Sequence, residues 1–103
     1  MADIFIEYKG RGIKEKKIKT ITTDNINSVI VELKFDAEWE QYSQKVVVFS
    51  ANERTAYKKY LDENNKCIVP WEVLEQPGNI TLGVVGVSED KVYTSVLASI
   101  PIH

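Results

Sequence analysis

Apolar and polar residues alternate with a period of two through much of the chain, which predicts β-strands. The clearest case is the segment 29–35, where every second residue is apolar and faces one side of the strand. Clusters of turn-forming residues separate such runs roughly every 8–12 residues, a spacing typical of β-sandwiches. The inward-facing residues predicted from this alternation include Val31, Leu33, Phe35, Val46, Val48, Leu82, Val84 and Val96.

The chain opens with a predicted hairpin. Residues 4–8 alternate at strand period, and residues 10–12 supply the glycines that a tight turn needs. Residues 13–22 return with many lysines and are too polar for a central strand, so they predict an edge strand or a projecting arm. We therefore expect residues 1–22 to form a basic N-terminal hairpin or arm, and residues 26–102 to form the core of the sandwich.

Proline and glycine mark one short helical turn in the C-terminal half. Pro70 fits the first position of a helix, because no backbone donor is needed there. Residues 70–75 are therefore expected to form a single helical turn, which Pro77 and Gly78 end. The remaining short strands are predicted at residues 46–49, 55–61, 67–69, 79–87 and 91–100, with turns at 24–25, 52–54 and 62–66.

Length and composition agree with this pattern. A chain of 103 residues fits one domain with a single core. Valine and isoleucine together number 23, against 10 for leucine and alanine, which favours strands over helices. The sequence therefore predicts one all-β domain spanning residues 1–103, an antiparallel β-sandwich of seven or eight strands.

Charge and hydropathy argue against nucleic acid and membranes as partners, and against export of the chain. A formal net charge of −2 gives no overall attraction to nucleic acid or to anionic lipid. No apolar run approaches about 18 residues, the length of a membrane span. The N-terminus lacks the basic start and long apolar run of a signal peptide. We therefore expect no nucleic-acid partner, no membrane partner and a reduced, non-exported setting.

Residue types that often carry catalysis or metal binding are present without the pattern that such chemistry needs. Asp36, Glu38 and Glu40 lack the spaced acidic motif of a calcium loop and are interpreted as a solvated loop. Cys67 is interpreted as buried and inert, because the only histidine is His103, at a terminus expected to be mobile. We therefore predict a protein that is not an enzyme, with no catalytic, cofactor-binding or metal-binding residues.

The aromatic residues are divided between core and surface. Trp39 and Trp71 are predicted to fill the open ends of the sandwich as core residues. Tyr57, Tyr60 and Tyr93 are ambiguous, because tyrosine is common both on strands and at interfaces.

Charge is unevenly distributed, and this carries the predicted partner interface. Residues 9–19 hold six lysines and arginines against one glutamate. One interpretation is an edge strand that its lysines keep soluble, and the other is a contact with an acidic protein surface. The candidate interface residues are Lys14, Lys16, Lys17 and Lys19.

Residues 29–100 also resemble a module found in virion structural proteins of tailed phages and prophages of Gram-positive bacteria. The segment NKCIVPWEVL, residues 65–74, is its most distinctive part. The resemblance lies in the order of these features: Phe35-Asp36, Glu38-Trp39, Tyr42, Lys45 with residues 46–49, Leu61-Asp62, residues 65–74, Pro77-Gly78, Ile80, Leu82, residues 83–87 and Thr94.

The resemblance implies an Ig-like β-sandwich that acts by binding, without catalysis or cofactors. Proteins of this kind serve as head-fibre bases, capsid decoration proteins and anchoring domains of baseplate or tail-fibre proteins. The longer relatives continue into a fibre, whereas this sequence stops at His103, which favours a small accessory protein. The predicted function is therefore capsid decoration, with the major capsid protein as the favoured partner and a homo-oligomer on the particle left open.

Two other functions remain open at this stage. The first is a baseplate or tail-fibre adapter, whose partner would be a tail or baseplate protein. The second is a carbohydrate- or peptide-binding module encoded by a prophage or its host. The expected location is the virion, and the cytoplasm of the bacterial host during assembly.

Overall fold

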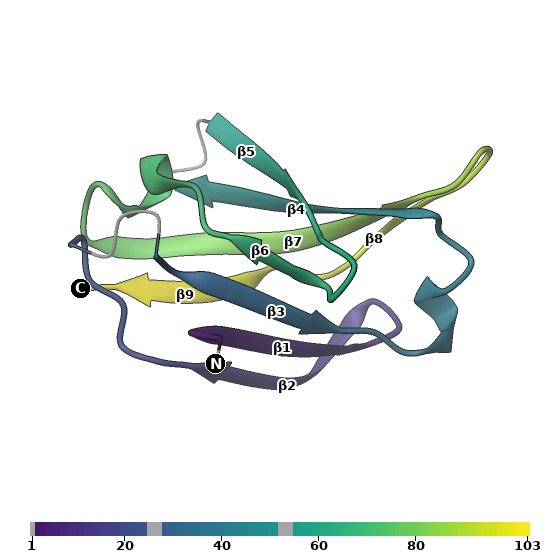
Figure 1. The fold of residues 1–103 in the computed structure, drawn as a ribbon, viewed down its shortest axis with the longest axis horizontal. Helices are drawn as coiled ribbons and strands as arrows, with labels where there is room; N and C mark the ends of the chain where they lie inside the picture. The colour runs from purple at the N-terminus through teal and green to yellow at the C-terminus, as the bar shows by residue number, and fades with distance from the viewer. Residues whose placement is uncertain (1, 25–27, 52–54) are drawn as a thin grey trace.

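The computed structural model describes residues 2–24, 28–51 and 55–103, and this part of the chain forms two packed β-sheets (Figure 1). Sheet A has the strand order β2-β1-β3-β6, and sheet B has the order β5-β4-β7-β8, with β9 also paired to β7. The bounds in sheet A are β1 Ile4–Lys9, β2 Gly12–Ile18, β3 Ile30–Lys34 and β6 Lys66–Ile68. Those in sheet B are β4 Gln44–Ala51, β5 Thr55–Tyr60, β7 Gly78–Val87, β8 Val92–Thr94 and β9 Ala98–Ile102.

The predicted all-β sandwich is confirmed, with nine strands among the described residues where seven or eight were expected. The additional strand arises because the predicted strand 91–100 is interrupted at residues 95–97, which divides it into β8 and β9. The predicted helical turn near residues 70–75 is present as the 3₁₀ helix η2 (Trp71–Leu74). A second 3₁₀ helix, η1 (Ala37–Trp39), lies in the segment that was expected to be a loop.

The N-terminal hairpin is part of the sandwich. Strand β1 lies inside sheet A, paired antiparallel to β2 and parallel to β3, and β2 forms the edge of the sheet. Ile4, Ile6 and Tyr8 are buried. The edge-strand interpretation therefore holds for β2, and the hairpin does not project as an arm.

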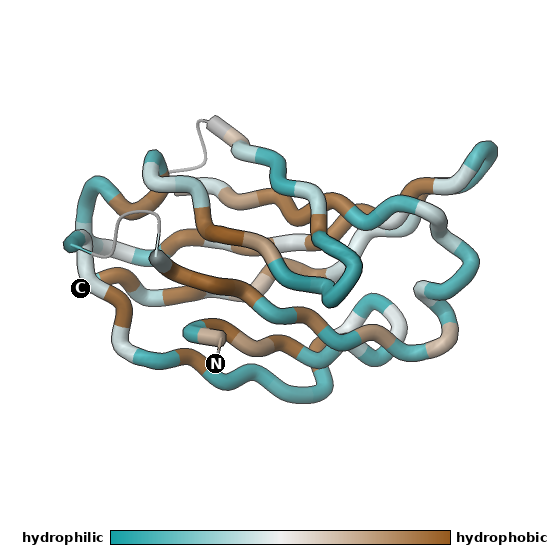
Figure 2. Tube along the Cα trace, viewed as in Figure 1, coloured by the Kyte–Doolittle hydropathy of each residue, from teal (hydrophilic) through white to brown (hydrophobic). Residues whose placement is uncertain are grey.

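The core lies between the sheets and is made mainly of aliphatic side chains on alternating positions of the strands. Figure 2 shows the hydrophobic residues along the strands, while hydrophilic residues occupy the turns and much of β2. Of the predicted core residues, Val31, Leu33, Leu82 and Val84 are buried. Phe35 is only half-buried, at the end of sheet A.

The predicted phase of β4 is wrong. Val46 and Val48 were expected in the core, but Val47 and Phe49 are the buried residues of this strand. Four consecutive apolar residues carry no alternation, so their sequence does not indicate which pair faces inward. Pairing with β7 decides the phase, because it places Val47 beside the buried Val84.

The prediction for Val96 is also wrong, since 49% of this residue is exposed. It lies in the interruption between β8 and β9, where the strand period no longer applies. Ser95 is buried there instead, and its hydroxyl accepts a 2.9 Å hydrogen bond from the backbone N–H of Val84.

One side of the sandwich is closed by backbone hydrogen bonds between the two sheets. The N–H of Val96 donates to the carbonyl oxygen of Arg11 at 2.9 Å, and the N–H of His103 donates to that of Ile21 at 2.8 Å. Thr23 donates in turn to the carbonyl oxygen of His103 at 3.1 Å. The expectation of a mobile His103 is therefore wrong for its backbone. We call this contact the β2–β9 seam.

Two predicted turns fall partly or wholly outside the described residues, namely 24–25 and 52–54. Among the described residues, no helix has the length and apolar character needed to cross a membrane.

Candidate partner interface

The four lysines of the predicted interface lie on β2 or directly after it, and all four are exposed. Two of them approach glutamates on the outer face of sheet A. The Nζ atom of Lys14 lies 3.7 Å from Oε2 of Glu7, and that of Lys17 lies 3.3 Å from Oε1 of Glu15. The Lys17–Glu15 pair is exposed on both sides and contributes little to stability, whereas the side chain of Glu7 is only 18% exposed.

Lys16 points in another direction from Lys17. It pairs in register with Ile6, a core residue, and its Nζ atom donates a 3.3 Å hydrogen bond to the carbonyl oxygen of Ser99 on β9. The alternation of side chains along an edge strand explains this difference, because neighbouring residues face opposite sides. The predicted basic surface is therefore divided between the outer face of sheet A and the β2–β9 seam.

An open hollow of about 440 Å³ borders two of the lysines on the outer face of sheet A. Its lining combines apolar side chains with charged side chains of both signs. The lining residues are Ala2, Asp3, Phe5, Lys17, Ile18, Lys19 and Glu32. This hollow combines apolar area with charge, as protein-binding surfaces do, and the sequence did not predict it.

An aromatic cluster fills the end of the sandwich near η1. The ring of Trp39 lies 4.8 Å from that of Tyr93 and 5.0 Å from that of Phe35. Tyr93 stacks on Tyr42 at 5.3 Å, and the guanidinium of Arg11 lies 4.9 Å above the Tyr93 ring. The prediction that Trp39 belongs to the core is confirmed, since the residue is fully buried.

The acidic segment after β3 has a structural role that the solvated-loop interpretation missed. One carboxylate oxygen of Asp36 accepts a 2.8 Å hydrogen bond from the N–H of Gly10, and the other accepts one from the N–H of Glu38 at 3.2 Å. Oε2 of Glu38 accepts a 2.7 Å hydrogen bond from the hydroxyl of Tyr93. This bond to Glu38 is the main reason why the pKa of Tyr93 is raised. Asp36 therefore ties η1 to the β1–β2 turn of sheet A, and Glu38 ties η1 to β8 of sheet B.

The core prediction for Trp71 is wrong, since 45% of this residue is exposed on η2. Helix η2 buries Val73 and Leu74 instead. A periodicity argument cannot assign the faces of one helical turn, because four residues point in every direction around its axis.

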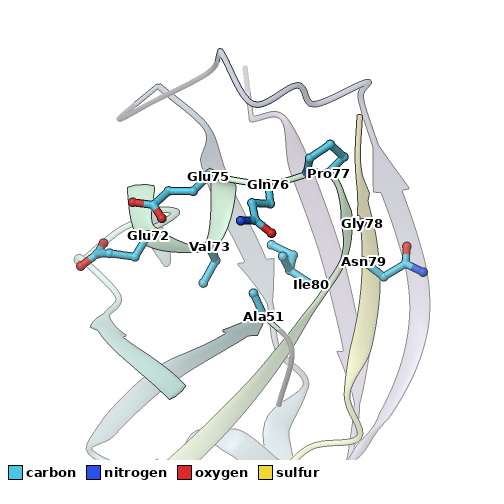
Figure 3. A pocket seen from close by; sticks show the side chains of 9 residues that line it. All are labelled: Ala51, Glu72, Val73, Glu75, Gln76, Pro77, Gly78, Asn79 and Ile80. Carbon is cyan, nitrogen blue, oxygen red and sulfur yellow. The ribbon is translucent and has the colours of Figure 1, made fainter. Parts of the chain in front are cut away.

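A small hollow of about 150 Å³ lies beside η2 (Figure 3). Glu72 and Glu75 lie on one side of it and Asn79 on the other, with Ala51 and Ile80 below. Its acidic residues come from one short turn, and no Lys or Arg is among the described residues that line it.

Cys67 is half-buried rather than fully buried as predicted. The residue lies on β6 and packs against the core. Burial raises the pKa of this thiol to about 12, although the positive charge of Lys59 opposes the shift. Since the thiolate is the nucleophilic form, the raised pKa lowers the reactivity expected of Cys67 near neutral pH.

Comparison with known proteins does not assign the chain to a family. No protein-family model matches the chain, and no curated protein matches it as a relative. The function must therefore be argued from the surfaces described above.

Proposed function

We propose that the protein is a non-enzymatic accessory protein of a phage virion, which decorates the capsid by docking its basic strand β2 on an acidic surface of the major capsid protein. The observation that carries this proposal is the run of four successive exposed residues, 14–17, at the edge of sheet A. Three of these residues are exposed lysines, whose contacts with Glu7, Glu15 and Ser99 are 3.3–3.7 Å long. The resemblance in residues 29–100 supplies the virion context.

The hollow beside Lys17 and Lys19 adds an apolar component to this surface. Phe5 and Ile18 line it, so an acidic partner would also find apolar area to bury. Burial of apolar area supplies affinity, whereas the lysines supply orientation and faster association. A decoration protein needs only a modest affinity of this kind for each contact when the copies on a particle are linked to one another.

The test is a variant in which all four lysines become glutamate: Lys14→Glu, Lys16→Glu, Lys17→Glu and Lys19→Glu. We expect this variant to fold and to lose binding to particles of the phage that encodes the protein, measured by co-sedimentation. Wild-type binding should also weaken as salt rises, because salt screens exposed charges. A folded variant that binds particles as well as wild type contradicts the proposal.

The matched control changes the same amount of charge elsewhere. It replaces four other exposed lysines by glutamate and should retain particle binding. Loss of binding in both variants would assign the effect to net charge rather than to β2. The control positions are Lys9, Lys58, Lys59 and Lys91, all of them exposed. Lys34 is kept, because its Nζ atom lies 4.0 Å from Oε2 of Glu7, which Lys14 also approaches.

The exposure of Trp71 favours a second candidate function, a carbohydrate-binding module. Sugar-binding sites commonly use exposed aromatic rings as stacking platforms, and Trp71 lies on the surface next to Pro70. A titration with neutral and N-acetylated oligosaccharides, followed by tryptophan fluorescence, tests it. Trp39 is fully buried, so a response should come from Trp71 and disappear in Trp71→Ala. No response with any oligosaccharide would remove this candidate.

A further inference from the structure

Apolar side chains on four neighbouring strands and on the segment between β8 and β9 lie on the outer face of sheet B, where the valines of β4 and β7 are half-buried. Tyr60, Val92 and Leu97 are each about two-thirds exposed, at 68%, 67% and 65%. Contiguous apolar area of this kind on a sheet face typically marks an interaction surface. We call the following set the outer apolar face: Val46, Val48, Tyr60, Val85, Val87, Val92 and Leu97.

Cross-strand pairing arranges this face in three rows. The central row holds Tyr60, Val46 and Val85, which are partners across β5, β4 and β7. A flanking row lies two residues away on each side of it. One flanking row consists of Lys58, Val48 and Gly83. Leu97 covers the glycine of this row. The other flanking row consists of Gln44, Val87 and Val92.

Opposite charges lie at matching distances from the central row. Lys58 precedes Tyr60 by two residues on β5, and Asp62 follows Tyr60 by two residues. Asp62 is exposed and lines a small hollow together with Tyr60 and Gln44. Its Oδ1 atom accepts hydrogen bonds from the N–H groups of Asn64 and Lys66, so its negative charge is held at the corner of the face by its own turn. Lys58 is also exposed. The face thus has a positive corner at Lys58 and a negative corner at Asp62, on opposite sides of the central row that holds Tyr60.

We propose that the outer apolar face binds a second copy of this chain, across a two-fold axis that crosses the strands at the row of Tyr60, Val46 and Val85. Such an axis exchanges the two flanking rows. Leu97 then packs on Val87 and Val92 of the second copy, and the central row packs on itself. This contact goes beyond the proposed function and does not depend on it.

Charge decides the direction of the axis. An axis across the strands places Lys58 opposite Asp62 of the second copy, which pairs the two charged corners twice. An axis along the strands would place Lys58 over Leu97 and Tyr60 over Thr94 instead, as the register shows. That arrangement would cover the charge of Lys58 with the apolar side chain of Leu97, and the desolvation of this charge would cost free energy. Complementary charges therefore favour antiparallel facing strands.

The size of the face predicts a weak dimer. Four strands about 4.8 Å apart and three rows give a face of about 20 Å by 20 Å. The two copies together would bury about 800 Å², below the roughly 1,200–2,000 Å² of stable interfaces. We therefore expect a dissociation constant on the order of 0.1–1 mM.

Sedimentation equilibrium across about 0.02–2 mM protein tests the contact. The wild-type mass should rise with concentration from 11.7 kDa toward twice that value. Tyr60→Glu puts like charges on the axis and should abolish the rise, whereas Ile68→Glu should not. Ile68 is the matched control, because it is an exposed apolar residue on sheet A. A wild-type chain that stays monomeric, or a Tyr60→Glu variant that dimerises normally, overturns the proposal.

A short bis-maleimide cross-linker tests the register. Position 60 lies on the proposed axis, so Tyr60→Cys should be cross-linked to its own copy. Lys58→Cys should not be, because its two copies would lie about 14 Å apart along the strands. Wild type reports the background of Cys67, the single native cysteine. Efficient cross-linking of Lys58→Cys without that of Tyr60→Cys would overturn the proposed axis.

Discussion

The indole Nε1–H of Trp39 donates a 2.7 Å hydrogen bond to the carbonyl oxygen of Gly10. The N–H of Gly10 donates to Asp36, so both backbone groups of this glycine are bound by the η1 segment. Gly10 has a φ of +57°, which a glycine adopts without strain, and it forms the turn between β1 and β2. The β1–β2 turn is therefore held by Trp39, which fills this end of the core, and by Asp36.

Replacing the two tryptophans should have different effects on stability. Trp39→Ala should lower the free energy of unfolding by about 3–5 kcal/mol, since it removes a fully buried ring and its hydrogen bond. Trp71→Ala should lower it by about 1–3 kcal/mol, because 45% of that residue is exposed and its side chain makes no hydrogen bond to the described residues comparable to that of Trp39. Urea denaturation measures both. Equal losses would contradict the burial of Trp39.

A pair of glycines tests how tightly the aromatic cluster is packed. A Cβ atom added at Gly86 would lie 3.0 Å from Cγ of Tyr42 and 3.2 Å from Cζ3 of Trp39. Gly86→Ala should therefore cost about 1–3 kcal/mol through overpacking. Gly12→Ala is the control, because the nearest atom to its added Cβ is 3.7 Å away. Thermal melts should show a clear loss for the first variant and little change for the second.

Asp36 should matter for stability more than its neighbours in sequence. Asp36→Ala removes the acceptor for two backbone N–H groups and should cost about 1–2 kcal/mol, as the loss of a helix N-cap does. Glu40→Ala removes an exposed carboxylate from the same segment and should change stability by less than about 0.5 kcal/mol. Denaturant midpoints of the two variants make the comparison, and equal midpoints would show that Asp36 is only solvated.

Alkaline pH should destabilise the fold through Cys67. Burial raises the pKa of this thiol from 9.0 to about 12, so the folded state keeps its proton while the unfolded state loses it. Stability from this group is complete below about pH 9 and is lost as pH rises toward 12, by at most about 1.4 kcal/mol per pH unit. Cys67→Ala should remove this slope between pH 9 and 11. An unchanged slope would mean that other groups cause it.

The fold was predictable wherever alternation was clear. Val31 and Leu33 lie in an alternating segment and are buried as expected. Val46 and Val48 lie in an uninterrupted apolar run, where only pairing with β7 decides which residues face the core. Trp71 shows the same limit for one helical turn, because its exposure depends on which residues of η2 the sheets cover.

The candidate site was predictable only as a set of residue types. The lysine-rich edge strand followed from the sequence, but the separation of Lys16 from Lys17 depends on the strand that lies beside β2. The bonds from Asp36 to Gly10 and from Glu38 to Tyr93 join residues far apart in the chain. Such contacts leave no local pattern, so a run of acidic residues was interpreted as solvated.

The β2–β9 seam also has a consequence for folding kinetics. It joins Ile21 to His103, and β1 pairs in parallel with β3 only after the intervening residues have crossed over. Contacts this distant in sequence require large loops to close, and the chain loses conformational entropy before the stabilising hydrogen bonds form. We therefore expect refolding on a timescale of roughly milliseconds to seconds, with the seam formed in the last steps.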